Sequence, residues 1–219
     1  MPPARNTPPA ADLLASLPAP LRELAAQGAL RRYRANTTLI EEGDRGDSLF
    51  VVLSGSLRIF CADPNGREIT LAIYGPGEYV GEMSLDGGPR SASVSTEEAS
   101  VCAVVGGAAL RQHLAANPEF TLELIQRLIR RTRLATESAR SLALLDAYGR
   151  LVRLFDGLAV ARADGTRMLA QRLTHRDIAQ RIGCSRELVS RLLKDLQQGG
   201  YVALEAQRYA LLRKLPAKW

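Results

Sequence analysis

Residues 173–191 read LTHRDIAQRIGCSRELVSR, and this stretch decides the architecture of the second half of the chain. Thr174 is expected to cap a short helix, because its side chain can accept from the backbone of Asp177, which also complements the positive helix start. Gly183 ends that helix, and Ser185 is expected to cap the next one. Two helices joined by a short, glycine-containing turn form a helix-turn-helix.

The second of these helices carries a polar face opposite its apolar one. Arginine can donate two hydrogen bonds to guanine and glutamate can accept one from cytosine, both in the major groove of DNA. The pattern therefore predicts a helix that reads G·C pairs rather than a merely solvated helix face. His175 and Arg176, at the start of the first helix, are candidates for contacts with backbone phosphate. The candidate DNA-contacting residues of the turn and second helix are Ser185, Arg186, Glu187, Ser190 and Arg191.

The charge distribution supports a polyanionic partner. The 219 residues suit one large or two modest domains, and the net charge is +6. Residues 146–219 carry 14 Lys and Arg against 7 Asp and Glu, a net charge of +7, whereas residues 1–145 carry 15 against 16, a net charge of −1. Charge alone favours nucleic acid first and an anionic membrane surface second.

The first half of the chain has a different sequence pattern. Residues 1–20 hold six of the eleven prolines, which predicts a disordered N-terminal tail ahead of a short helix over residues 21–28. Short apolar runs separated by glycines follow from Leu30 to Val105, as expected for strands of a sandwich or jelly roll.

A long helix is predicted after Pro118, because apolar residues recur with helical spacing and no glycine or proline follows until Gly149. A helix of this length needs a partner for its apolar stripe, and a second copy of the chain is the simplest one. Asp146 is expected to cap the next helix and to mark a hinge.

Residues 75–93, GPGEYVGEMSLDGGPRSAS, form the other unusual stretch. Glycines let backbone approach a ligand and expose N–H groups, while Arg90 and Ser91 suit an anionic oxygen. Glu82 can accept a hydrogen bond from a hydroxyl. Together these groups describe a site for a ribose phosphate, although Gly-Gly-Pro also occurs in ordinary turns.

Both stretches, in this order, resemble the catabolite activator and fumarate-nitrate regulator (CRP/FNR) superfamily of bacterial transcription factors, over roughly residues 30–212. The resemblance implies an α+β fold: a cyclic-nucleotide-binding β jelly roll over 21–116, a long central dimerisation helix over 117–145 and a winged helix-turn-helix over 146–219. By position, Arg90 and Ser91 match the residues that hold the cyclic phosphate in this family, and Glu82 matches the residue that contacts the ribose. Gly81 matches a residue that makes a backbone contact, and Arg131 matches a residue that supports the glutamate. The implied effector-binding set is Gly81, Glu82, Met83, Ser84, Arg90, Ser91, Arg131, Ala135 and Thr136.

The identity of the effector stays open at this point. Members that respond to cyclic AMP present two adjacent hydroxyl residues to the adenine, whereas this chain has Ala135 and Thr136. The missing hydrogen bond removes on the order of 1 kcal/mol of discrimination. Cyclic AMP is favoured, and cyclic di-GMP or no nucleotide at all are the alternatives. The segment between Glu82 and Arg90 is also shorter than in the catabolite activator itself.

The resemblance further implies a homodimer on palindromic double-stranded DNA with half-sites like TGTGA, with RNA polymerase as a further partner. A cyclic-nucleotide module without specific DNA readout is the competing hypothesis. An enzyme is disfavoured, because the two histidines lie far apart in the chain and no metal-ligand cluster or nucleophile–base pair is evident. Three scattered cysteines predict neither disulfides nor an iron–sulfur cluster. No apolar run suits a signal peptide or a membrane span, so a cytoplasmic protein is expected.

Overall fold

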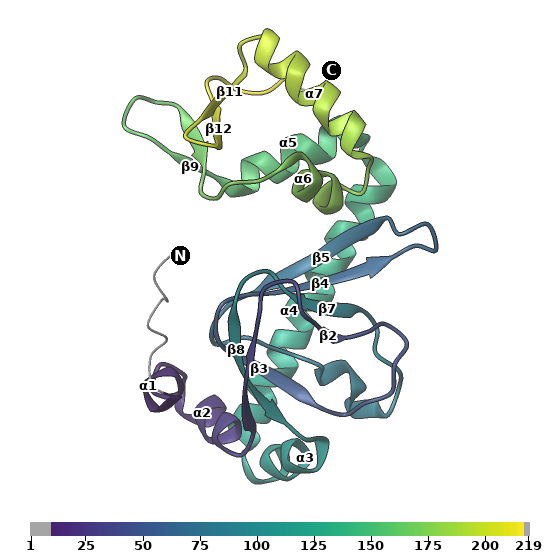
Figure 1. Cartoon of the computed structure of the whole chain (residues 1–219), viewed down its shortest axis with the longest axis vertical. Helices are drawn as coiled ribbons and strands as arrows, with labels where there is room; N and C mark the ends of the chain where they lie inside the picture. The colour runs from purple at the N-terminus through teal and green to yellow at the C-terminus, as the bar shows by residue number, and fades with distance from the viewer. Residues whose placement is uncertain (1–9, 217–219) are drawn as a thin grey trace. The chain divides into compact units, whose positions relative to one another are not determined.

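The structure is a computed structural model that describes residues 10–216, and the chain divides into two compact units (Figure 1). The N-terminal unit comprises the described residues up to Cys61 together with Thr70–Arg131. The C-terminal unit comprises Ala62–Ile69 and the described residues from Thr132 onward.

Two four-stranded sheets build the N-terminal unit. One has the order β1-β8-β3-β6 and the other the order β2-β7-β4-β5. The first sheet contains β1 (Ala29–Tyr33), β8 (Ser100–Val105), β3 (Leu49–Ser54) and β6 (Tyr79–Val80). The second contains β2 (Thr38–Ile40), β7 (Ser93–Thr96), β4 (Leu57–Ala62) and β5 (Glu68–Tyr74).

The strand β3 shows why this unit folds as layers. Its first five residues are all buried, as expected for a central strand that is covered on both faces. Because alternate side chains point to opposite faces, Leu49, Val51 and Leu53 belong to one apolar cluster, whereas Phe50 and Val52 belong to another. The second cluster also contains Leu57 and Val94 from the other sheet, so it fills the space between the sheets.

Helices cover the opposite face of the β3 sheet. Leu24 of α2 (Ala19–Ala26), Leu110 of α3 (Gly107–Ala116) and Phe120 of α4 (Pro118–Leu144) all join the cluster that contains Leu49. Figure 1 shows α2 and α3 at one end of the two sheets. The helix α3 was not predicted.

The N-terminal segment differs from the predicted disordered tail. Residues 1–9 lie outside the described residues, but Ala10–Ala15 form the helix α1. Leu13 and Leu17 are 7% and 4% exposed and belong to the core cluster of the N-terminal unit. Burial of these two leucines, four residues apart, outweighs the effect of the prolines around them.

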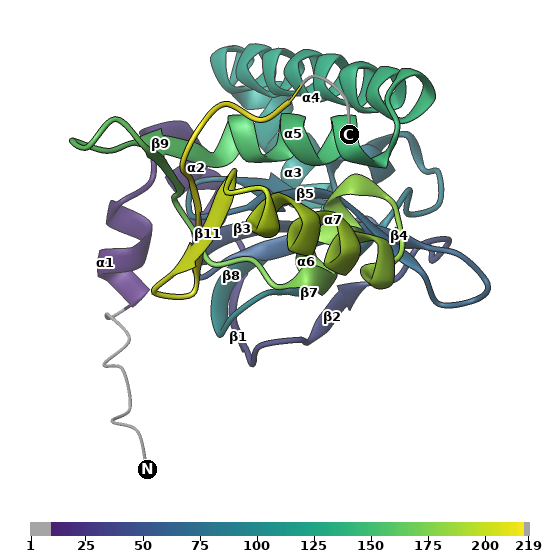
Figure 2. The same cartoon turned by 90° about the horizontal axis from the view of Figure 1, so that it is seen from above.

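The C-terminal unit is a helix-turn-helix with a small sheet. Its sheet has the order β11-β12-β10-β9, and Figure 2 shows α6 and α7 side by side. The unit contains α5 (Ala147–Leu158), β9 (Ala159–Ala161), β10 (Arg167–Leu169), α6 (His175–Ile182), α7 (Arg186–Gln198), β11 (Val202–Glu205) and β12 (Arg208–Leu211). The hairpin of β11 and β12 is the predicted wing, whereas β9 and β10 were not predicted. The expected α+β fold class is confirmed.

The predicted helix caps of this unit are present. Thr174 and Asp177 form a reciprocal capping box at α6, and Ser185 Oγ accepts from the backbone N–H of Leu188 at 3.2 Å. Asp146 Oδ1 accepts from the backbone N–H of Gly149 at 2.7 Å. These bonds satisfy backbone donors that a helix start leaves open, so short polar motifs set where the helices begin.

No helix among residues 10–216 combines the length and apolar character needed to cross a membrane.

The core of the C-terminal unit should depend on Phe155, which is fully buried between the helices and the sheet. We expect Phe155→Ala to lower the free energy of unfolding by about 3–5 kcal/mol, because it removes apolar contacts and leaves a cavity. Urea denaturation followed by circular dichroism measures the change. The matched control is Leu204→Ala, at a side chain that is 56% exposed on the wing and should change stability by about 0.5 kcal/mol or less. Equal losses in both variants would contradict this assignment of the core.

Candidate functional site

A tight loop follows β6 in the N-terminal unit. Gly81 has a φ of +99°, and a short 3-10 helix, η1, covers Glu82–Asp86. A side chain at position 81 would collide with the carbonyl oxygen of Ser48, and its Cβ would lie 2.8 Å from Arg90 Nη1. Only glycine fits this backbone, and it lets the start of the loop lie directly against Arg90.

Glu82 is a buried carboxylate with only one of its oxygens satisfied. The residue is 6% exposed, and Oε1 accepts from Arg131 Nη1 at 2.5 Å. Among the described residues Oε2 is buried and has no hydrogen-bond partner. A buried acceptor without a donor costs free energy, so Oε2 is set to accept from a hydroxyl or amide of a ligand.

Arg131 is fixed by more than the ion pair. It donates from Nη2 to the carbonyl oxygen of Tyr79 at 2.8 Å, and its guanidinium lies 4.3 Å from the centre of the Tyr74 ring. Burial raises the pKa of Tyr79 to about 12, so its phenol stays protonated beside this cation. The arginine therefore couples Glu82 to β6 and to α4.

Arg90 is a buried cation at the end of the loop. It is 8% exposed and donates from Nη1 to the carbonyl of Gly81 at 3.1 Å and from Nη2 to the carbonyl of Ser48 at 2.9 Å. Burial lowers the pKa of Arg90, which Asp47 opposes, but a guanidinium stays charged at neutral pH. Because it has five N–H donors, donors remain for an anionic ligand.

Ser91 lies next to this cation and is exposed. Its hydroxyl donates to Met83 Sδ at 3.3 Å, and a thioether is a weak acceptor that an anionic oxygen can replace. Met83 is 60% exposed, whereas Ser84 is buried.

The structure thus brings Gly81, Glu82, Arg90 and Arg131 together. Ala135 and Thr136 are exposed residues on the part of α4 that belongs to the C-terminal unit, and Thr136 Oγ1 donates to the carbonyl of Thr132 at 3.0 Å.

The helix α7 presents the polar face that the sequence predicted. Arg186, Glu187 and Arg191 are exposed, while Val189, Leu193 and Leu196 pack into the core of the unit. Arg176 of α6 is also exposed. Within residues 10–216 none of these three arginines forms an ion pair or a side-chain hydrogen bond, so their donors are available to phosphates or bases.

His175 occupies a different position from the exposed arginines. Its Nδ1 lies 2.7 Å from Ser190 Oγ on α7, and its Nε2 lies 3.0 Å from the hydroxyl of Tyr209 on β12. Both ring nitrogens therefore have protein partners. The sequence does not predict the contact between His175 and Tyr209, because residues 34 positions apart leave no local pattern.

No group of three or more His, Cys, Asp or Glu side chains among residues 10–216 has the arrangement of a metal site.

The Glu82–Arg131 pair should be a stability determinant of the N-terminal unit. We expect Arg131→Met to lower the free energy of unfolding by about 3 kcal/mol, because it leaves a buried charge without its partner. The double variant Glu82→Gln with Arg131→Met should recover much of that loss. Urea denaturation measures both, with Arg130→Met, at an adjacent exposed arginine, as control. An Arg131→Met variant as stable as the control would show that the ion pair does not contribute to the free energy of unfolding.

Comparison with known proteins gives consistent relatives. The cAMP-activated global transcriptional regulator CRP of Salmonella typhimurium is 30% identical over 181 residues, which cover 80% of this chain and 85% of that protein. The CRP-like cAMP-activated global transcriptional regulator of Mycobacterium tuberculosis is 34% identical over 174 residues, which cover 78% of each chain. Among solved structures, the c-di-GMP responsive global regulator CLP of Xanthomonas campestris has a TM-score of 0.79 at 28% identity, with 88% of this chain and 98% of that chain covered.

Family models match both units. The cyclic nucleotide-binding domain model matches residues 30–117, and the Crp-like helix-turn-helix domain model matches residues 149–216. The family comprises transcription regulators rather than enzymes. With the buried carboxylate and arginine in one unit and the exposed arginines of α7 in the other, the chain belongs to the CRP family of cyclic-nucleotide-binding transcription regulators.

Proposed function

We propose that the protein is a dimeric, sequence-specific DNA-binding regulator whose affinity for DNA is controlled by cyclic AMP bound at the Glu82–Arg90 loop. The observation that carries this proposal is the unpartnered, buried Oε2 of Glu82 beside a second buried charge, Arg90. A carboxylate and a guanidinium at one loop suit a ligand that combines a hydroxyl donor with a negative charge.

A cyclic nucleotide meets both requirements. Its ribose 2′-hydroxyl can donate to Glu82 Oε2, and its phosphate can accept from Arg90 and from the hydroxyl of Ser91. The backbone of Gly81 lies beside Arg90, and because Gly81 has no side chain, the ligand can approach this backbone closely. Met83 and Ser84 complete the loop around these groups.

The choice among nucleotides rests on charge and on relatives. The loop carries one buried arginine, which suits a ligand with a single phosphate such as cyclic AMP. The two curated relatives are named as cAMP-activated, whereas the Xanthomonas structure is named as responsive to c-di-GMP. Of the two residues that the family resemblance implies for the base, Thr136 has a hydroxyl and Ala135 has none, so we expect modest discrimination among bases.

A second copy of the chain is the partner that we assign to α4. Leu122, Ile125 and Ile129 recur at helical spacing and are 56%, 47% and 47% exposed. An exposed apolar stripe on a helix is stabilised by a matching helix, and two-fold symmetry would present two copies of α7 to a palindrome. We propose half-sites like TGTGA, RNA polymerase as a further partner and a cytoplasmic location.

Titration calorimetry tests the nucleotide site. We expect wild-type protein to bind cyclic AMP more tightly than cyclic GMP or cyclic di-GMP. Glu82→Gln should weaken binding about tenfold or more, because it removes a hydrogen bond to a charged acceptor. Glu119→Gln, at an exposed carboxylate of α4, should bind like the wild type. Tighter binding of cyclic di-GMP would reassign the effector, and equal losses in both variants would remove Glu82 from the site.

Gel-shift titration tests the DNA-reading helix. With cyclic AMP present, we expect the wild type to prefer a TGTGA-type palindrome over a scrambled duplex. Arg186→Ala should relax base choice at one position of each half-site, with a loss of about 1–3 kcal/mol per contact. Arg176→Ala should weaken binding to both duplexes equally and lower the salt dependence by about one phosphate contact. Equal wild-type affinity for both duplexes would indicate a nucleotide module without specific DNA readout.

A further inference from the structure

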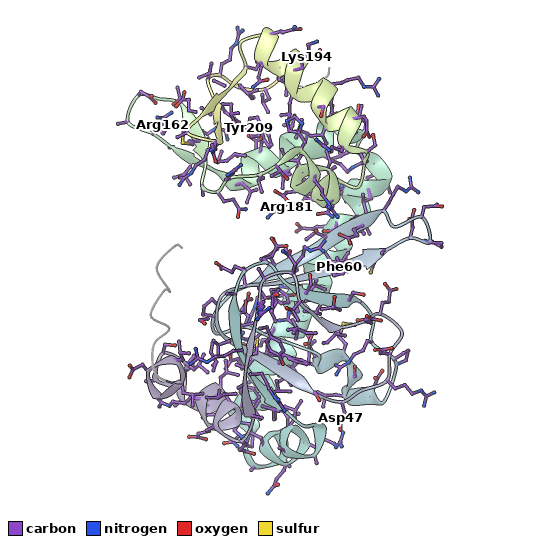
Figure 3. The ribbon with its side chains drawn as sticks, in the orientation of Figure 1. Asp47, Phe60, Arg162, Arg181, Lys194 and Tyr209 are labelled. Atoms are coloured by element: carbon purple, nitrogen blue, oxygen red, sulfur yellow. The ribbon has the colours of Figure 1, made fainter. Side chains whose placement is uncertain are left out.

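The ring of His175 joins the DNA-reading helix to the wing. Figure 3 shows Tyr209 on the side of β12 that faces the helices of the C-terminal unit. The residue is 4% exposed, and the centre of its ring lies 5.6 Å from that of Phe155. From this fixed position the Tyr209 hydroxyl lies 3.0 Å from His175 Nε2, and His175 Nδ1 lies 2.7 Å from Ser190 Oγ.

Of the three hydrogen-bonded residues Tyr209, His175 and Ser190, Ser190 is the one that can contact DNA. It precedes Arg191 and follows Glu187 by three residues, so it shares the polar face of α7. It is half-buried, on the His175 side, rather than fully exposed like its neighbours. Within residues 10–216 the Ser190 hydroxyl has His175 as its hydrogen-bond partner and no second one.

The direction of the proton donors follows from the burial of Tyr209. Among the described residues its hydroxyl has no partner other than His175. Burial raises the pKa of Tyr209, so the group is a phenol that must donate its proton. A buried O–H without an acceptor is costly, so Tyr209 donates to Nε2. A neutral imidazole then carries its proton on Nδ1 and donates to Ser190 Oγ.

We infer that Tyr209 and His175 are positioning residues that make Ser190 a hydrogen-bond donor to the DNA. Because Oγ already accepts from Nδ1, the proton of Ser190 is left for an acceptor on the duplex, a phosphate oxygen or a base edge. In the opposite arrangement the Ser190 hydroxyl would donate to Nδ1, and the Tyr209 hydroxyl would have no acceptor among the described residues. The inference rests on the proposed DNA-binding function and adds a role for the wing in setting α7.

A double-mutant cycle tests this coupling, with DNA affinity measured by fluorescence anisotropy on the palindrome with cyclic AMP. Ser190→Ala removes the donor, and Tyr209→Phe keeps the ring but removes the hydroxyl that fixes the tautomer. Each should weaken binding about fivefold, as expected for one hydrogen bond. The double variant should also lose about fivefold, because both changes remove the same bond. Losses that multiply to about 25-fold, or a Tyr209→Phe variant that binds like the wild type, would overturn the inference.

Controls separate this effect from a loss of structure. Tyr148→Phe removes another phenol of the same unit, one whose hydroxyl donates to the carbonyl of Pro216 at 2.9 Å rather than to His175, and should leave affinity unchanged. Thermal unfolding of each variant checks the fold. If the wild type itself does not distinguish the palindrome from scrambled DNA, the proposed function fails instead.

The tautomer of His175 gives a readout that does not depend on DNA. The chain has only two histidines, so ¹⁵N spectra of the imidazole nitrogens are simple to assign. The ring whose signals change in Tyr209→Phe is His175. We expect its proton on Nδ1 in the wild-type protein. A wild-type ring protonated on Nε2 would overturn the inference.

Discussion

The half-satisfied ion pair between Glu82 and Arg131 is the interaction on which the proposed nucleotide site depends. Arg131 donates hydrogen bonds to Glu82 Oε1 and to the carbonyl of Tyr79, and its guanidinium lies over the ring of Tyr74. The second carboxylate oxygen is left buried without a partner. Removing two charges from water is costly, and the cost is recovered fully only when every oxygen is hydrogen-bonded. In our proposal a ligand hydroxyl supplies the missing bond.

The same arginine gives the site a physical connection to the rest of the chain. It lies on α4, whose first turn is anchored in the N-terminal core by Phe120, and α4 continues into the C-terminal unit. A ligand that contacts Glu82 therefore acts on a helix that both units share. The helices α6 and α7, by contrast, have their own core and caps. In our proposal the nucleotide changes how these rigid helices are presented to DNA rather than how they fold.

Local chemistry explains which features could be predicted. Caps at Asp146, Thr174 and Ser185 need only a polar side chain a few residues from a free N–H, so sequence reveals them. The packing of α1 depends on how Leu13 and Leu17 meet distant strands, and prolines nearby suggested disorder instead. The contact of His175 with Tyr209 joins separate elements in the same way. Chemistry and family resemblance point to the loop residues Gly81, Glu82 and Arg90, but only the structure shows that one oxygen of Glu82 lacks a partner among the described residues.

We propose that nucleotide binding and DNA binding are coupled through the protein, and reciprocal titration tests this coupling most directly. The affinity for the palindrome is measured with and without saturating cyclic AMP, and the affinity for cyclic AMP with and without saturating palindrome. Thermodynamic linkage requires both affinities to change by the same factor, which we expect to be about 5- to 150-fold. A nucleotide that binds tightly yet leaves the DNA affinity unchanged, with the DNA likewise leaving nucleotide affinity unchanged, would contradict the account.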